Sequence, residues 1–443
     1  MNGEATNTIP RKRTVATLRA YSAPLHSRMR SALGLVGPGV ITGAADDDPC
    51  AVGTYASAGA RFGFAMLWIA PVLFPMMAAT VYLCSKIGMV SGMGIGGVVR
   101  NYYSRWVLYP ILAALLVTNI IAAAADLGAI AASLRLIVPI PTPIIITVVT
   151  LGILAIQAWG SYEMLQRIFK WLALALLSYV GAALLAKPDL ASVLWGTFRP
   201  RIEFNADQLA VLVAVVGTSL SPYLFFWQAS QEVEEEIAID RFQVWQRRGA
   251  SREELHYAAV DVSVGMFFAS LIMYFIILCT AATLFRAGSM NIDSAYAAAQ
   301  ALRPLAGNAA SLLFAAGVVG VGILAVPVLT TGPAYALAEA FDWKHSLNHH
   351  PENAIEFYGV IVLSSVAALG LNFLGMNPIR ALFWAGVIQG FLAPLVMLLI
   401  MFITNNREIM GDHVNGRGIN VLGWATTAIT SAAAAGLLWT WLR

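Results

Sequence analysis

The chain has 443 residues, of which 59% are hydrophobic and only 12% are charged, and its mean hydropathy is +0.72. Soluble domains carry about 25% charged residues, so the composition predicts a protein that crosses a membrane several times and excludes a soluble enzyme. The basic residues behind the net charge of +3 are scattered along the chain, which argues against nucleic-acid binding.

Residues 1–30 are polar and basic, and they lack the apolar core and cleavage site of a signal peptide. We expect a cytoplasmic tail here, followed by a transmembrane transporter domain over residues 31–443. Apolar runs of about 20 residues predict transmembrane helices. Eleven such runs follow, over residues 35–58, 64–87, 107–134, 143–159, 166–186, 208–229, 260–285, 308–338, 356–374, 379–403 and 419–441.

Basic residues are distributed unevenly between the two sides that these helices define. With the N-terminus inside, 18 of the 27 Lys and Arg residues fall on the inner side and the other nine on the outer side. Inner loops are enriched in Lys and Arg, so we predict a cytoplasmic N-terminus, an outer C-terminus and a location in the plasma membrane. We interpret the connection from Glu232 to His256 as a solvated linker without a ligand site.

The first predicted helix contains three consecutive carboxylates, Asp46, Asp47 and Asp48, followed by Pro49. Each would cost roughly 2.5–3.5 kcal/mol if it faced lipid at the bilayer centre, so they must face protein, water or a cation. The alternative is a loop outside the membrane between two short helices, in which Asp48 caps the second helix and Pro49 starts it. A broken membrane helix restarts with the same capping geometry.

The sixth predicted helix is interrupted similarly, by Gly217-Thr-Ser-Leu-Ser-Pro222. Proline removes a backbone donor and disfavours helix before it, although an ordinary packed kink is the alternative here. Two interrupted helices at matching positions of two five-helix halves indicate an ion or substrate site. The odd offset of five helices predicts inverted repeats over about residues 35–186 and 208–403, with the helix at about 419–441 as an addition.

Oxygen ligands gathered at two such breaks suit hard cations such as Mg²⁺, Mn²⁺ or Ca²⁺. Asp46 and Asp47 do not share the direction of Asp48 on a regular helix; they are expected to line a vestibule, bind through water or carry protons. The predicted metal ligands are the carboxylate of Asp48, the carbonyls of Ala45 and Thr218, and the hydroxyl of Ser221.

Few groups within the predicted helices could carry protons. All six histidines fall in predicted inner loops, so a proton path would have to use carboxylates. Asp126 in the third helix is one candidate, and the alternative for it is a buried acid that locks helix packing. Glu339, near the inner end of the eighth helix, is explained by an interfacial position.

At the two breaks the chain resembles the Nramp (natural resistance-associated macrophage protein) family of divalent-metal transporters. Gly37-Pro38, Asp48-Pro49 and Ala58-Gly59 match its first-helix pattern, and Gly217-Thr218 with Ser221-Pro222 match its sixth-helix pattern. The resemblance implies an all-α, leucine-transporter-type fold. That fold has five plus five helices in an inverted repeat, here with one extra C-terminal helix, and helices 1 and 6 are broken at mid-membrane.

The chain departs from the family pattern at the metal ligands and along the proton path. Asp126 matches the family's third-helix aspartate, but Ala129 replaces the acid three residues later. A hydroxyl in place of a thioether favours hard cations, and smaller residues leave room for a partly hydrated ion. At the metal ligands, Ala51 stands in place of the family's metal-binding asparagine, and Ser221 stands in place of its metal-selecting methionine. Tyr223 and Gln228 stand in place of its two sixth-helix histidines. Gln228 remains a candidate for the vestibule or proton path.

We therefore predict a secondary transporter that moves a hard divalent cation, Mg²⁺ or Mn²⁺, by alternating access; proton coupling is left open. No nucleotide-binding signature is present, so the expected partners are the transported metal and the lipid bilayer, with neither a cofactor nor an ATP-binding partner. The alternative is a same-fold transporter of a cationic organic solute such as an amine or amino acid. An intramembrane enzyme is disfavoured because no histidine lies within the predicted helices, while a channel would use similar broken helices and acids.

Overall fold

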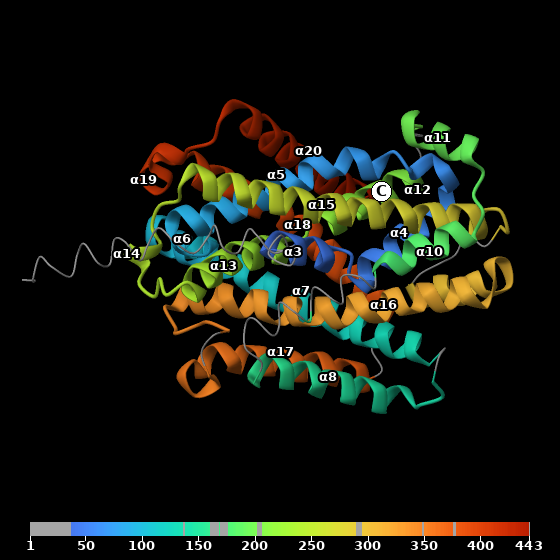
Figure 1. Cartoon of the computed structure of the whole chain (residues 1–443), viewed down its shortest axis with the longest axis horizontal. Helices are drawn as coiled ribbons and strands as arrows, with labels where there is room; N and C mark the ends of the chain where they lie inside the picture. The colour runs from blue at the N-terminus through green and yellow to red at the C-terminus, as the bar shows by residue number, and fades with distance from the viewer. Residues whose placement is uncertain are drawn as a thin grey trace, which may run out of the picture.

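The computed structural model describes residues 37–135, 138–159, 168, 176–201, 206–288, 295–347, 350–374 and 378–442. These residues form a bundle of long helices without a strand (Figure 1). Within the described ranges, 8 helices are long and apolar enough to cross a membrane. The chain is therefore a multi-pass membrane protein, as its composition predicts.

Each predicted span has a helical counterpart, and short helices connect the long ones. The predicted tail lies outside the described residues, as does most of the first half of the fifth span. In chain order the spans correspond to α3 (Pro38–Asp46) with α4 (Pro49–Phe62), α5 (Ile69–Ser91), α7 (Arg105–Leu134), α8 (Thr142–Trp159), α10 (Leu177–Leu185), α12 (Ala206–Ser219) with α13 (Pro222–Ala238), α15 (Arg252–Thr280), α16 (Ala295–Phe341), α17 (Ile355–Phe373), α18 (Pro378–Asn405) and α20 (Arg417–Leu442). The connecting helices are η2 (Gly63–Met66), α6 (Ile95–Tyr102), α11 (Leu190–Phe198), α14 (Val244–Arg247), η4 (Ala281–Phe285), η5 (Pro351–Asn353), α19 (Arg407–Met410) and η6 (Gly411–His413).

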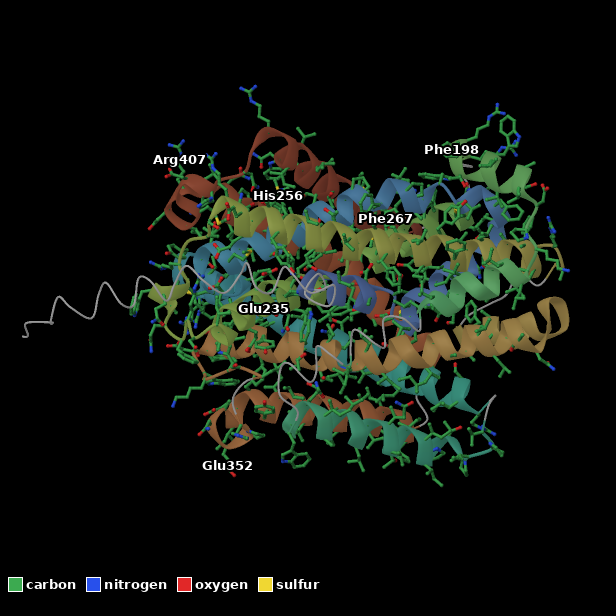
Figure 2. All side chains as sticks on the ribbon, in the orientation of Figure 1. Phe198, Glu235, His256, Phe267, Glu352 and Arg407 are labelled. Atoms are coloured by element: carbon green, nitrogen blue, oxygen red, sulfur yellow. The ribbon has the colours of Figure 1, made fainter. Side chains whose placement is uncertain are left out.

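The connecting segments gather at two opposite ends of the bundle. α6, α14 and α19 lie at one end, and α11 lies at the other (Figure 1). Among labelled side chains, Arg407 lies near the first end and Phe198 at the second (Figure 2). The segments assigned to one side of the membrane from the sequence are therefore grouped together in space. We call the end that carries α6, α14 and α19 the α14 end.

The interpretation of residues 232–256 as a solvated linker is wrong. α13 continues to Ala238, and α15 begins at Arg252. A capping box starts α15: Ser251 Oγ accepts from Glu254 N at 3.1 Å, and Glu254 Oε2 accepts from Ser251 N at 2.7 Å. Helical structure therefore replaces most of the expected connection.

Several polar residues of these extended helices also differ from expectation. Glu232, Glu234 and Glu236 are buried along α13, because neighbouring helices pack around its final turns. His256 is an exposed residue in the second turn of α15 rather than a loop residue. Glu339 of α16 is only 5% exposed, not interfacial, and it accepts hydrogen bonds from Gly97 N and Ser230 Oγ.

The first half of the broken helix, α3, packs unusually close to α15. A Cβ atom on Gly43 would lie 2.2 Å from the carbonyl oxygen of Gly265, so only glycine permits this approach. Asp261 of α15 also caps the start of α3, accepting hydrogen bonds from Gly37 N at 2.8 Å and Gly39 N at 2.7 Å. Small residues and one carboxylate thus fix the position of α3.

Candidate metal site

The first predicted break is present between α3 and α4. α3 ends at Asp46, Asp47 and Asp48 have non-helical backbone angles, and α4 starts at Pro49. Asp48 caps α4, since its Oδ1 accepts from Ala51 N at 2.8 Å. The capping geometry expected of both sequence interpretations is therefore observed, and the break is buried inside the bundle. The loop interpretation, which placed this segment outside the membrane, does not account for that burial.

The second predicted break lies between α12 and α13. α12 ends at Ser219, and α13 begins at Pro222 after an extended residue, Ser221. The Ser221 hydroxyl donates to the carbonyl oxygen of Thr218 at 2.8 Å. The predicted ligand groups of Thr218 and Ser221 therefore lie side by side, because both belong to the same interruption of the helix before Pro222.

The side chains of two tyrosines join the two breaks through three hydrogen bonds. Tyr223 Oη, in the first turn of α13, donates to Asp48 Oδ2 at 3.1 Å and to the carbonyl oxygen of Ala45 at 3.3 Å. On the other side of the break, Tyr55 Oη lies 3.0 Å from Ser219 Oγ. This bridge was not predicted from the sequence, in which Tyr223 stands out only as the replacement of a family histidine.

All three consecutive aspartates are buried, with exposures of 2%, 0% and 5% for Asp46, Asp47 and Asp48. Within the described residues, neither carboxylate oxygen of Asp47 has a hydrogen-bond partner, and Asp46 Oδ2 also has none. No group of three or more His, Cys, Asp or Glu side chains among those residues has metal-binding geometry. Asp46, Asp47 and Asp48 thus do not form one such group.

Asp126 and Gln228 lie in different parts of the bundle. Asp126 is fully buried on α7, one turn before Ile130. A Cβ atom on Gly322 of α16 would lie 2.5 Å from Ile130 and 3.2 Å from Pro49, so this part of α7 lies close to the start of α4. Gln228 is instead bonded to Thr42, with 2.5 Å between Gln228 Oε1 and Thr42 Oγ1, on the α14 side of the breaks.

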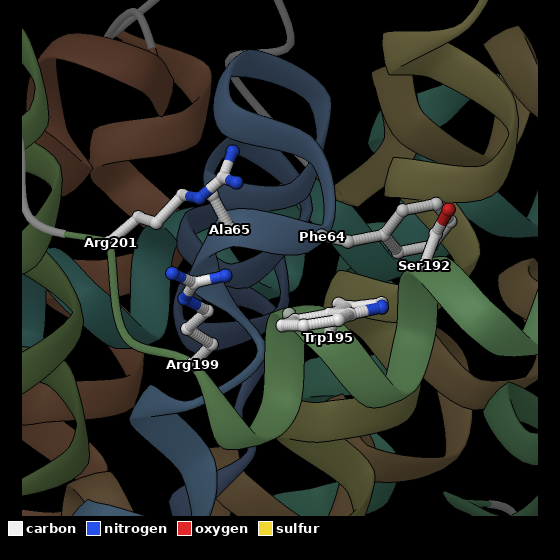
Figure 3. A pocket seen from close by; sticks show the side chains of 7 residues that line it. Phe64, Ala65, Ser192, Trp195, Arg199 and Arg201 are labelled. Atoms are coloured by element: carbon white, nitrogen blue, oxygen red, sulfur yellow. The ribbon is translucent and has the colours of Figure 1, made fainter.

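A separate cavity lies at the opposite end of the bundle. It has a volume of about 220 Å³. The guanidinium of Arg199 stacks over the Trp195 ring at 5.2 Å from its centre. This cavity lies beyond the C-terminal end of α4 and does not include either break; its lining residues are Phe64, Ala65, Ser192, Trp195, Gly196, Arg199 and Arg201 (Figure 3).

The family model "Natural resistance-associated macrophage protein-like" matches residues 39–440. The chain belongs to the Nramp family. The similarity to this family therefore extends beyond the two breaks to nearly the whole chain. Members of this family are transporters, not enzymes.

Nramp relatives with curated names cover almost the full length of the chain. The protein named divalent metal cation transporter MntH of Deinococcus radiodurans is 27% identical, over 96% of this chain and 94% of its own length. The protein of the same name from Verminephrobacter eiseniae is 28% identical, over 91% of this chain and 89% of its own length.

Solved structures show the fold. The manganese transporter of Eremococcus coleocola has a TM-score of 0.75 at 16% identity, covering 93% of this chain and 87% of its own. Mhp1, a nucleobase-cation-symport-1 family transporter, has a TM-score of 0.59 at 15% identity, covering 91% of this chain and 92% of its own. The leucine-transporter-type fold implied by the sequence resemblance is confirmed.

The bridge between the breaks generates a prediction for Tyr223→Phe. Loss of the hydroxyl removes the side-chain donor to Asp48 Oδ2 and leaves only the backbone to orient this carboxylate. Loss of such outer hydrogen bonds typically weakens metal binding by about 10–100-fold. Isothermal titration calorimetry with Mn²⁺ on purified wild type and variant measures this change. The control is Tyr102→Phe, which removes a hydroxyl bonded to Arg248 far from the breaks. Unchanged or tighter Mn²⁺ binding by Tyr223→Phe would contradict the assignment.

Proposed function

We propose that this Nramp protein is a secondary transporter of hard divalent cations, Mg²⁺ or Mn²⁺, and that the ion binds between the two helix breaks. The observation that supports this most directly is the position of Tyr223 Oη. It lies 3.1 Å from Asp48 Oδ2 and 3.3 Å from the Ala45 carbonyl oxygen. Asp48 Oδ2 and the Ala45 carbonyl oxygen are predicted ligand atoms on either side of the first break. Both therefore lie within hydrogen-bonding distance of one hydroxyl beside the second break.

The electrostatics of this region favour a cation. Asp46, Asp47 and Asp48 are buried together, and none of the ion pairs in the described ranges involves them. Burying an unpaired carboxylate is expensive unless a proton or a cation compensates it. The carbonyl oxygens of Ala45 and Thr218 at the same breaks add partial negative charge, so a divalent cation would compensate the negative charge of this region.

The donor atoms favour a hard ion over a soft one. Asp48, Ala45, Thr218 and Ser221 offer only oxygen, and hard cations such as Mg²⁺ and Mn²⁺ prefer oxygen to sulfur. Ser221 stands where the family has methionine, and Ala51 stands where it has asparagine. Both side chains are smaller, which leaves room for water that Mg²⁺ gives up reluctantly.

The relatives support a metal over an organic solute. The MntH proteins that match the chain over most of its length are named divalent metal cation transporters, and a structurally similar protein is a manganese transporter. A cationic amine or amino acid, the alternative solute, would also meet the buried carboxylates. The family membership makes it the less favoured candidate.

We further propose that the α14 end faces the cytoplasm of a cell whose plasma membrane holds the protein. In this topology residues 1–30 form an inner tail, residues 31–443 form the transporter domain and the C-terminus lies outside. The excess of Lys and Arg in the segments of the α14 end supports this orientation.

Labelling of single introduced cysteines tests the orientation. Exposed Glu408 on α19 and partly exposed Ser192 on α11 lie at opposite ends, so we replace each with cysteine in a background without the three native cysteines. In intact cells, a membrane-impermeant maleimide should label Ser192→Cys and not Glu408→Cys. The reverse pattern would contradict the orientation.

Asp48→Ala tests the transport function. Proteoliposomes that contain the wild type should take up Mg²⁺ or Mn²⁺ saturably, and Asp48→Ala should abolish this uptake because it removes the only charged ligand proposed. Uptake is measured for Mg²⁺, Mn²⁺, Ca²⁺ and Cd²⁺ with a metal-sensitive dye inside the vesicles.

The matched control is Asp412→Ala, which removes an exposed carboxylate on η6 and should leave uptake unchanged. Absence of metal uptake by the wild type, or uptake that is indifferent to Asp48→Ala, would overturn the proposed function. Competition of the same uptake by organic amines would then test the alternative solute.

A further inference from the structure

The α14 half of α13 carries a buried carboxylate that the proposed metal site does not use. Glu232 is only 7% exposed and lies more than two helical turns beyond Tyr223 along α13. It packs against α5, where a Cβ atom on Gly88 would lie 3.0 Å from Glu232 Cβ. An acidic side chain at such a close helix contact requires a chemical explanation, since charged residues are rarely buried without a partner.

Glu232 belongs to a chain of hydrogen bonds that crosses three helices. Glu232 Oε1 accepts from Gln228 Nε2 at 2.8 Å and from Ser85 Oγ of α5. Gln228 Oε1 in turn accepts from Thr42 Oγ1 of α3 at 2.5 Å. One side-chain network therefore links α3, α13 and α5 on the α14 side of the metal site.

Glu232 has no counter-ion among the described residues. The ion pairs found there join Arg100 with Asp342 and Arg241 with Glu236 and Glu254. The nearby charged groups that act on Glu232 are negative: Asp261 on α15 and Glu235 on its own helix. The other helices that pack against α13 carry further acidic and basic groups. Lys86 of α5 donates to Asn415, Arg100 of α6 pairs with Asp342, and Glu339 of α16 is bonded to Ser230 and Gly97. Asp46 of α3 and Asp126 of α7 lie near the first break, and the described side chains of α18 include no acidic or basic group.

A carboxylate in these surroundings is stable when it holds a proton. Its acid form is uncharged, and it still accepts the bonds from Ser85 and Gln228. Its ionised form would face two further negative groups in a water-poor environment. Glu234, two residues away, is different: it accepts from Tyr335 Oη, Ser346 Oγ and Leu347 N, a set of donors that suits an ionised structural carboxylate.

We propose that Glu232 is a proton-binding site of the transport cycle, protonated while α3, α13 and α5 are joined and deprotonated when they part. On opening toward the α14 end, the O–H bond of Glu232 breaks, the proton passes to water on that side and a solvated carboxylate remains. Return of the helices requires a proton to be taken up again. The proposal deepens the proposed function, on which it rests, by assigning proton movement to a residue outside the metal site.

The bonds of α3 make it the element whose movement would expose Glu232. Thr42 of α3 holds Gln228, and the start of α3 is held by Asp261 and by the glycine contact with α15. Rocking of one helix group against the other is how broken-helix transporters alternate access. Separation of α3 from α13 would break the Thr42–Gln228 bond first and admit water to Glu232.

Glu232→Gln tests the proposal in proteoliposomes that report Mn²⁺ uptake and internal pH with two dyes. The wild type should move protons together with Mn²⁺, and its uptake rate should depend on pH. Glu232→Gln should retain Mn²⁺ binding and uptake but lose the accompanying proton movement and the pH dependence, because the amide cannot release a proton. Glu232→Asp should keep both, since it restores a titratable group.

Glu234→Gln is the matched control, an identical substitution of a buried carboxylate that has a full set of donors. It should keep the wild-type proton movement even if it lowers thermal stability. Proton movement retained by Glu232→Gln, or Mn²⁺ uptake by the wild type without protons, would overturn this proposal alone. Loss of uptake by folded Glu232→Gln and Glu232→Asp together would assign Glu232 a structural role and overturn it as well. Absence of Mn²⁺ uptake by the wild type would overturn the proposed function and this proposal with it.

Discussion

The structure depends on one constraint: a helix that is interrupted inside a membrane must find new partners for its backbone groups. At the first break Asp48 caps α4, and at the second Ser221 donates to the Thr218 carbonyl. These local bonds leave other oxygen atoms unused, and Tyr223 brings Asp48 and Ala45 together across the gap. The proposed site is thus a consequence of two breaks whose polar groups satisfy each other incompletely.

The chain keeps the fold of the Nramp family while changing the chemistry at its centre. Tyr223 replaces a histidine with a phenol that bonds the proposed ligands, and Ser221 replaces a thioether with a hydroxyl. Gln228, at the second histidine position, is joined to Glu232, which lies on the α14 side of the breaks. We interpret this as a shift of proton chemistry away from imidazole and toward a carboxylate, consistent with the lack of histidine in the predicted helices.

The sequence was sufficient to predict the bundle and both breaks, because long apolar runs and Pro-terminated polar interruptions depend on local chemistry alone. The ligand assignments of Asp48 and Ser221 remain predictions, although the breaks face each other as expected. The burial of Glu232 could not be predicted, since an acidic run after an apolar stretch is typical of a solvated segment. Only the Ser251–Glu254 capping box signalled that α15 began earlier than the apolar run.

The central claim is that the oxygen donors between the two breaks select a hard divalent cation. The most direct measurement is calorimetric binding of Mg²⁺ and Cd²⁺ to the purified wild type and to Ser221→Met. The account predicts that the wild type binds Mg²⁺ and that Ser221→Met strengthens Cd²⁺ binding relative to Mg²⁺, because a thioether is a soft ligand. An unchanged ratio of the two affinities, in a variant that folds as the wild type does, would place the metal elsewhere and contradict the account.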